Sequence, residues 1–328
     1  MPYATSCFAS ADVSLAFLLV LAIEVPFIPQ KPNTCGPAAL AMLANFYGQP
    51  VTQDEIADAI YLPEIRGTLS TDLADFARRY GLWVRQYRGT RADLHQKLSA
   101  GIPIIVLGKL GNRYHYFVVL DYRDDELIVH SDTRPNLRMR EDDFLRWWNR
   151  ADRWTLLVCP PERATWRLSA DEHNDLGVFL EQTGNLAAAA GHYRNAADLA
   201  PRNSYFCMNF GNALLKQKLF AEAAAAFRSA VERDSNNADA LNNLAYTYGE
   251  LNANLDEAVV LCERAIALHP SHRAYYLDTL GTLLLKQGDA KGAVAAFEQA
   301  LTATTERQSS LRTGISDRLT AARALVGK

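Results

Sequence analysis

Two features that would place a chain in a specialised class, an imbalance of charge and paired cysteines, are missing from this sequence. The 34 basic and 37 acidic residues leave a formal charge of -3, too balanced to indicate a nucleic-acid-binding surface or a polybasic membrane patch. The five cysteines are odd in number and widely spaced, without a Cys-x-x-Cys pair, which disfavours a disulfide framework and a thiolate zinc site. With 49% hydrophobic residues over 328 positions, the composition is that of two folded domains.

A long apolar segment is also missing. The largely apolar run 13–23 has 11 residues, whereas a membrane-spanning helix needs about 20. No basic residue precedes it, because the first is Lys31, so the positive start of a secretory signal is absent. Residues 1–23 are either a signal or anchor remnant or a buried first element, and Cys7 could carry a lipid. We expect export, to the periplasm or a membrane anchor, rather than a cytoplasmic location, with membrane association only through this segment.

A change in composition near Pro160 and Pro161 divides the chain. A strand-like run at 154–158 precedes the prolines, and Ala-rich helical sequence follows them. Paired prolines fit neither the interior of a helix nor a central strand. We therefore place the end of a first domain, 24–161, at this point.

The sequence after the boundary repeats. Small residues recur at Gly177, Gly211, Ala245 and Gly281, and Gly211 follows Gly177 by 34 positions. An alanine stands 12 residues after each of the three glycines and an aromatic residue 16 after, while in the third unit each offset is one longer. This pattern resembles the tetratricopeptide repeat, with four repeats over 169–307 and a capping helix in 308–328. The resemblance implies an all-α superhelix in which small residues lie where two helices cross.

The repeats lack a catalytic grouping and fit two interpretations. They form either a stacked scaffold or a groove that binds a protein partner. Asparagines on the first helices of the units could line such a groove, although asparagine also occurs in purely structural repeats. The candidate contacts are Asn209, Asn212, Asn242, Asn243 and Tyr246.

The first domain changes from helical to strand-like periodicity along its length. Helices are predicted over 36–47, 53–60 and 70–80, followed by strands over 83–87, 102–107, 114–122, 127–130 and 154–158. Because helices precede strands, the order predicts an α+β domain in which a helical half packs on an antiparallel sheet.

Cys35 has the chemical context that the other cysteines lack. It stands at the start of the first predicted helix, before Gly36 and Pro37, and the first turn of a helix accepts proline. Unpaired N–H groups and the positive end of the helix dipole then favour the thiolate, which is the nucleophile. Gly36 would leave room for a substrate backbone. A lone cysteine would more simply be a small residue in a tight turn, so the assignment depends on partners.

Three further residues complete a candidate site. His115 heads a hydrophobic strand, and Asp132 follows the next strand. Antiparallel pairing would bring them together, as a base and the carboxylate that orients it. Gln30, five residues before Cys35, could donate its amide to the oxyanion.

Two alternatives to these partners remain open, Asp121 as the third residue and His130 as the histidine. The remaining histidines lack metal-ligand spacing, and we expect no metal and no cofactor.

These residues together carry a family resemblance. Gln30, the sequence Cys35-Gly36-Pro37-Ala38, a His-aromatic-Val-Val strand and a following strand that ends in Asp resemble the C39-type cysteine peptidases. The resemblance implies a papain-like domain with a late helix over 143–148, and members of the family clip leader peptides from bacteriocins at double-glycine sites. This chain departs from the family in reading Asp132-Thr133 where Asp-Pro is common. Its Gln-to-Cys interval is also one residue shorter than in papain relatives. It has no nucleotide-binding loop, so the exporter role is not expected.

Three functions are consistent with the sequence. The first is a cysteine endopeptidase with a Cys-His-Asp triad, whose repeats recruit a protein substrate or partner. The second is a papain-like amidase or transpeptidase that passes the acyl group to an amine. The third is a non-catalytic adaptor that only binds peptide, which the joint presence of Cys35, His115, Asp132 and Gln30 disfavours.

Overall fold

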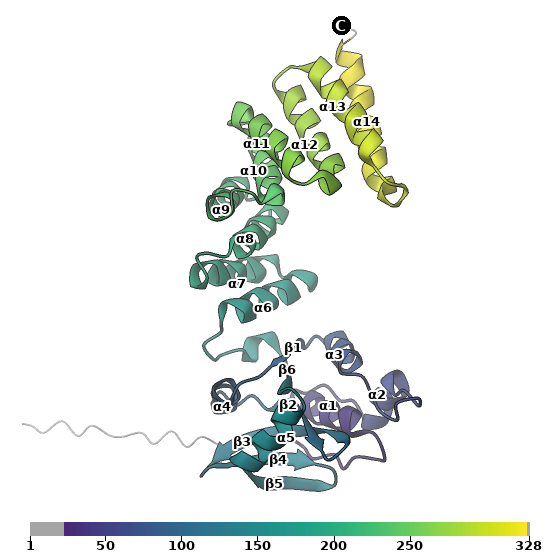
Figure 1. Cartoon of the computed structure of the whole chain (residues 1–328), viewed down its shortest axis with the longest axis vertical. Helices are drawn as coiled ribbons and strands as arrows, with labels where there is room; N and C mark the ends of the chain where they lie inside the picture. Colours follow the sequence, from purple (N-terminus) through teal and green to yellow (C-terminus); the bar gives the residue numbers. More distant parts are fainter. Residues whose placement is uncertain (1–22, 327–328) are drawn as a thin grey trace, which may run out of the picture. The chain divides into compact units, whose positions relative to one another are not determined.

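The computed structural model describes residues 23–326 and divides the chain into two units (Figure 1). One unit ends at Trp166 and the other begins at Arg167. Cys7 and all but the last residue of the apolar run 13–23 lie outside the described residues. Among the described residues, no helix is both long and apolar enough to cross a membrane.

The first unit is an α+β domain, as the sequence predicts. Within residues 23–166, six strands form one antiparallel sheet in the order β1-β6-β2-β3-β4-β5. The helices are α1 Cys35–Phe46, α2 Gln53–Ile60, α3 Ser70–Arg79, α4 Arg91–Ser99 and α5 Glu141–Arg150. The strands are β1 Trp83–Arg88, β2 Ile104–Leu110, β3 Arg113–Arg123, β4 Glu126–Ser131, β5 Arg134–Arg140 and β6 Trp154–Cys159.

Helix α1 is the centre of the helical half. Its residues from Gly36 to Ala44 are all buried, as expected of a helix that is apolar on every side. Val118 and Leu120 of β3 belong to the same core cluster as α1. Phe117, which alternation points to the opposite face, instead stacks on Trp147 of α5. Strand β3 therefore has helices packed on both of its faces.

Two elements of the first unit were not predicted. Helix α4 buries only Leu94, Lys97 and Leu98, so its sequence has no broad apolar stripe. Strand β5 lies at the edge of the sheet and is mostly exposed, and Pro135 interrupts its pattern. Both elements are too weakly buried to leave a clear periodicity.

The second unit consists, within residues 167–326, of four helix pairs and a final helix. The pairs are α6 Ala170–Gln182 with α7 Leu186–Leu199, α8 Ser204–Lys216 with α9 Phe220–Arg233, α10 Ala238–Leu251 with α11 Leu255–Leu268, and α12 Arg273–Lys286 with α13 Ala290–Ala303. The last helix is α14 Ser309–Val326. Ile315, Leu319 and Ala322 of α14 are buried against the last pair, so it acts as a cap.

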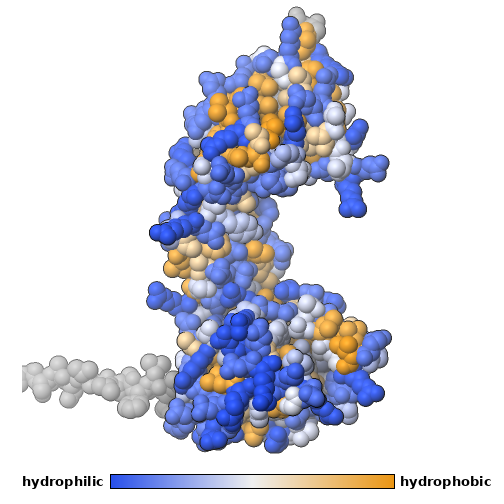
Figure 2. Space-filling view, viewed as in Figure 1, coloured by the Kyte–Doolittle hydropathy of each residue, from blue (hydrophilic) through white to orange (hydrophobic). Residues whose placement is uncertain are grey.

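The small residues of the repeat lie where two helices cross, as predicted. A Cβ atom added to Gly211 would stand 2.6 Å from the ring of Phe227. Gly281 meets Phe297 in the same way, at 2.6 Å. The three-residue turn of the third pair contains Asn252 and Asn254 with left-handed backbone. On the face that Figure 2 shows, apolar surface gathers over α11 to α13 of this unit.

Candidate active site

One cleft in the first unit contains all four predicted site residues. Gln30, Cys35, His115 and Asp132 line a cavity of about 870 Å³. Apart from Asn33, the other lining residues come from two segments, 65–70 between α2 and the start of α3, and 107–116 around the turn between β2 and β3. A Cβ atom on Gly36 would meet Thr68 of the first segment and Tyr116 of the second, so the head of α1 lies between them.

Cys35 begins helix α1 and is partly exposed, whereas Cys159, Cys207 and Cys262 are buried. Burial raises the pKa of the Cys35 thiol. Hydrogen bonds from the backbone amides of Tyr116, Gly36 and Cys35 itself act in the opposite direction on this pKa. Cys35 lies at a helix start, as the sequence predicts. Desolvation nevertheless has a larger effect on its pKa than the hydrogen bonds from the backbone amides. Burial therefore favours the neutral thiol over the thiolate.

The space beside Gly36 is not left for a substrate, contrary to the expectation from the sequence. An added Cβ atom would stand 2.4 Å from Oγ1 of Thr68 and 3.1 Å from Leu73. The missing side chain therefore lets the 65–70 segment pack against the head of α1. Gly36 sets the width of the cleft by allowing this close approach.

His115 has a direct hydrogen-bond partner that the sequence did not reveal. Its Nε2 atom lies 3.3 Å from Oγ of Ser131 and 3.6 Å from Oδ1 of Asp132. A carboxylate on this side favours the proton on Nε2, which leaves Nδ1 as the basic nitrogen. Burial lowers the pKa of His115, and Asp132 partly opposes that shift. The ring of Phe117 meets the imidazole edge-on at 4.7 Å and restricts its rotation.

Asp132 holds Gln30 at the tip of the β4–β5 hairpin. It has a left-handed backbone with φ of 53°, a conformation that Asp tolerates in turns. Its backbone carbonyl accepts from the Gln30 amide at 3.1 Å. Its Oδ1 accepts from Nε2 of Gln30 at 3.0 Å. One of the two hydrogens of the Gln30 side-chain amide is therefore engaged, and the other remains for a ligand.

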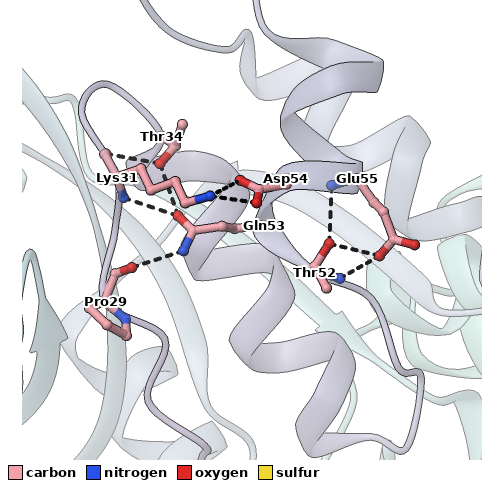
Figure 3. A network of polar contacts seen from close by, with 7 residues as sticks. All are labelled: Pro29, Lys31, Thr34, Thr52, Gln53, Asp54 and Glu55. Carbon is pink, nitrogen blue, oxygen red and sulfur yellow. Dashed lines mark hydrogen bonds and ion pairs between the residues drawn. The ribbon is translucent and has the colours of Figure 1, made fainter.

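Gln53 fastens the loop that connects Gln30 to Cys35 (Figure 3). Its Nε2 donates to the carbonyl of Pro29 at 2.9 Å. Its Oε1 accepts from the Lys31 amide at 3.1 Å and from Oγ1 of Thr34 at 3.0 Å. The Gln53 side chain is buried at the start of α2. The preceding residue, Thr52, caps this helix through a capping box with Glu55, which Figure 3 also shows. The loop is thus held immediately before Gln30, immediately after it, and next to Cys35.

The two competing residues lie away from the cleft lining. Asp121 forms an ion pair with Arg123 at 2.6 Å. His130 is buried, with Nε2 3.1 Å from the Val25 carbonyl and Nδ1 accepting from the Asn136 amide at 3.1 Å. With one nitrogen accepting and the other donating, His130 has the arrangement of a neutral structural histidine. Among residues 23–326, no group of three or more His, Cys, Asp or Glu side chains could hold a metal ion.

The asparagines of the second unit pair with one another across neighbouring repeats. Asn209 donates to Asn174 at 2.8 Å, and Asn243 donates to Asn212 at 3.0 Å. Asn209 and Asn212 line a cavity of about 330 Å³ between α6 and α8. Of the other predicted contacts, Asn242 accepts from Cys262 and Tyr246 is 40% exposed. Asn209, Asn212 and Asn243 therefore link first helices, and Asn209 and Asn212 also line a cavity.

A cysteine at the head of a central helix, packed on an antiparallel sheet that carries a histidine, defines a papain-like domain. Residues 25–162 match the Peptidase C39 family, and residues 208–273 and 252–309 match the tetratricopeptide repeat. The first unit therefore contains a domain of the peptidase C39 family, and the second contains tetratricopeptide repeats. This confirms the resemblance and the fold class predicted from the sequence.

Two curated proteins are similar over parts of the chain. Protein FlbA of Caulobacter vibrioides is 29% identical over 126 residues, which are 38% of this chain and 21% of FlbA. The probable functional amyloid protease FapD of Pseudomonas fluorescens is 25% identical over 167 residues, which are 46% of this chain and 73% of FapD. The chain thus matches about a fifth of the length of FlbA.

Solved structures are similar over parts of the chain. The peptidase domain of Streptococcus ComA, a bi-functional ABC transporter involved in a quorum sensing pathway, is 23% identical with a TM-score of 0.38. That match covers 42% of this chain and 99% of the ComA domain. MamA from Desulfovibrio magneticus RS-1 is 21% identical with a TM-score of 0.38, over 41% of this chain and 75% of MamA.

Proposed function

We propose that the protein is a cysteine endopeptidase in which Cys35 is the nucleophile and His115 the general base. The observation that carries the proposal is the single cleft lined by Cys35, His115, Asp132 and Gln30. Membership of the first domain in a peptidase family supports the same reaction class. Asp132, with Ser131, orients the imidazole so that Nδ1 takes up the proton.

The proposed reaction starts from a neutral pair, because burial raises the pKa of Cys35 and lowers that of His115. Nδ1 of His115 removes the thiol proton as the sulfur attacks the substrate carbonyl carbon. The Cys35 amide and the second amide hydrogen of Gln30 donate to the resulting oxyanion. His115 then protonates the leaving amine, and water releases the acyl group from the thioester.

Product analysis on full-length protein tests this proposal. Denatured casein is incubated with the wild-type protein and with Cys35→Ala, and the fragments are identified by mass spectrometry. Alanine fits a helix start, so the variant should keep its circular dichroism spectrum while losing turnover. Fragments with free carboxyl ends that need Cys35 would support a peptidase. Equal fragmentation by Cys35→Ala, or none by either protein, would contradict it.

A papain-like transferase is the second candidate, because the same acyl-enzyme can react with an amine. The casein experiment is repeated with added glycinamide. Products that carry glycinamide at their new carboxyl ends, in excess over hydrolysed products, would favour the transferase. A peptidase should give hydrolysed ends at an unchanged rate.

We further propose that the repeats recruit the protein substrate or a partner, through the surface that Asn209, Asn212 and Tyr246 help to form. A chain truncated after Trp166 tests the idea. The cut should not fall at Pro161, because Trp166 stacks on Trp83 at 5.9 Å within the first unit. The truncated chain should react with iodoacetamide at Cys35 and lose efficiency on protein but not on short peptides. Equal efficiency on protein would overturn recruitment.

A further inference from the structure

The candidate cleft carries more positive than negative charge. Arg66 lies on the 65–70 segment and Arg113 on the 107–116 segment, and both are exposed cleft residues. Neither guanidinium forms an ion pair with another described residue. Asp132 is the one carboxylate in the lining, and its Oδ1 already accepts from Gln30. A ligand in this cleft therefore meets two unneutralised cations.

Exposed apolar side chains accompany the two arginines. Ile65 is 55% exposed, Leu69 47% and Tyr114 56%, and all three line the cleft. Figure 2 shows apolar surface over the segment between α2 and α3 in the first unit. The ammonium group of Lys109 lies 5.1 Å from the ring centroid of Tyr114, which adds a third cation beside the cleft. Apolar surface bordered by cations suits a ligand that is both apolar and anionic.

Because the head of α1 lies between the two segments, a peptide positioned over Cys35 must run between them. Each segment contributes one arginine, so a carboxylate near the reacting bond is attracted from both sides, whereas a lysine is repelled. Resting on the proposed function, we propose that the cleft selects peptide segments in which an acidic residue stands beside apolar residues near the cleaved bond. Arg66 and Arg113 are the residues that determine this specificity.

Alkylation of Cys35 tests the charge preference without requiring any cleavage. Rates with anionic iodoacetate and neutral iodoacetamide are measured by mass mapping of the peptide that contains Cys35. The iodoacetate rate is divided by the iodoacetamide rate, so changes in the intrinsic reactivity of the thiol cancel. The ratio should fall roughly threefold or more in the double variant Arg66→Gln/Arg113→Gln, the size expected for exposed charge pairs.

A matched control separates the cleft from the general charge of the protein. Arg79 of α3 is exposed, lies outside the cleft lining and contacts the Phe76 ring at 5.9 Å. Arg79→Gln removes the same charge and should leave the ratio unchanged. At about 1 M salt, where the Debye length is about 3 Å, the wild-type ratio should approach that of the double variant. An unchanged ratio in the double variant, or an equal fall in Arg79→Gln, would overturn the proposal.

A peptide series distinguishes this inference from the proposed function. A casein peptide that spans a cleaved bond is resynthesised with Glu, Gln or Lys beside that bond. In wild type kcat/KM should fall in that order, and Arg66→Glu/Arg113→Glu should reverse it. Cleavage without charge preference would overturn the inference and leave the peptidase proposal intact. If no peptide is cleaved but the alkylation ratio depends on the two arginines, the peptidase proposal fails and the charged cleft stands.

Discussion

The two units use small side chains in different ways. In the second unit, the contact between a glycine and an aromatic ring occurs in three of the four helix pairs, as at Gly211 with Phe227. In the first unit, the close approach of Gly36 to Thr68 and the three hydrogen bonds of Gln53 each occur once. If one glycine–aromatic contact of the repeats is lost, the equivalent contacts in the other helix pairs remain. If the Gly36 contact or the Gln53 hydrogen bonds are lost, no equivalent contact replaces them. We therefore expect activity to be sensitive in the first unit and stability to be changed locally in the second.

The third repeat shows how far the repeated contact can vary. Ala245 stands where the other units have glycine, and Cys262 replaces the aromatic residue opposite. Both Ala245 and Cys262 are fully buried. A larger residue on one helix is thus matched by a smaller one on the other, so the volume at the crossing is conserved. A residue proposed for chemistry, such as Cys35 or His115, cannot be replaced in this way, because its role depends on its functional group and not only on its volume.

Removal of the base should give the largest effect. His115→Ala should lower the rate of casein cleavage by about 10³-fold, within the range for a lost general base. It should also slow alkylation of Cys35 by iodoacetamide, because in the proposed mechanism the same imidazole takes up the thiol proton. His95, a partly exposed histidine of α4 that pairs with Glu141, provides the control variant His95→Gln. Equal losses in both variants would point to a general structural effect and count against the assignment.

Asp132→Asn should cost less and should shift the pH profile in a defined direction. The negative charge of Asp132 raises the pKa of His115 against the larger effect of burial. Without that charge the pKa of His115 falls further below its ordinary value of 6.5, so the imidazole stays basic to lower pH. The acid limb of kcat/KM should therefore move to lower pH while the maximum drops roughly tenfold or more. A shift of the acid limb to higher pH would contradict the proposed pairing.

Periodicity and motif spacing predicted the main features of both units. Helix α2 was predicted with the boundaries that the structure has, and the proximity of His115 to Asp132 was predicted from antiparallel strands. These features depend on burial patterns along one element or on pairing between neighbours. The repeat was predicted because the same contact recurs at a fixed spacing.

Ser131 and Gln53 could not be found in the same way. Ser131 is small and polar, and its contact with His115 depends on how the end of β4 meets β3. Gln53 looks like an ordinary residue at the start of a helix after Thr52, and its hydrogen bonds reach residues about twenty positions earlier. A single side chain that bonds distant backbone has no period and no motif, so only the folded chain reveals it.

Gln53→Ala should show what such a single-copy contact contributes. The variant leaves the Lys31 amide and the Pro29 carbonyl without their partner, which should cost about 1–3 kcal/mol of stability if they stay buried. Gln30 and Cys35 should lose their fixed separation, so kcat should fall roughly tenfold with a smaller change in KM. Gln53→Glu keeps the acceptor for Lys31 and Thr34 but loses the donor to Pro29. Its kcat should lie between those of the wild type and Gln53→Ala.

The control for this effect is the neighbouring ion pair of Lys31 with Asp54, which is exposed. Asp54→Asn removes that pair from the same loop without changing the bonds of Gln53. It should leave kcat unchanged, because exposed ion pairs contribute little. A fall in kcat in Asp54→Asn as large as that in Gln53→Ala would show that any disturbance of the loop has the same result.

The smallest effect on activity is expected from the repeats, where two glycines allow a matched test. Gly211→Ala places a methyl group 2.6 Å from the Phe227 ring and should cost about 1–3 kcal/mol. Gly191 of α7 has nothing within 4 Å of an added Cβ, so Gly191→Ala should be neutral or gain up to about 1 kcal/mol from helix propensity. Urea unfolding followed by circular dichroism measures both. Alkylation of Cys35 should be the same in the two variants, because the change is confined to one repeat interface. If Gly211→Ala slows that alkylation and Gly191→Ala does not, the two units are not energetically independent and the comparison between repeated and single-copy contacts fails.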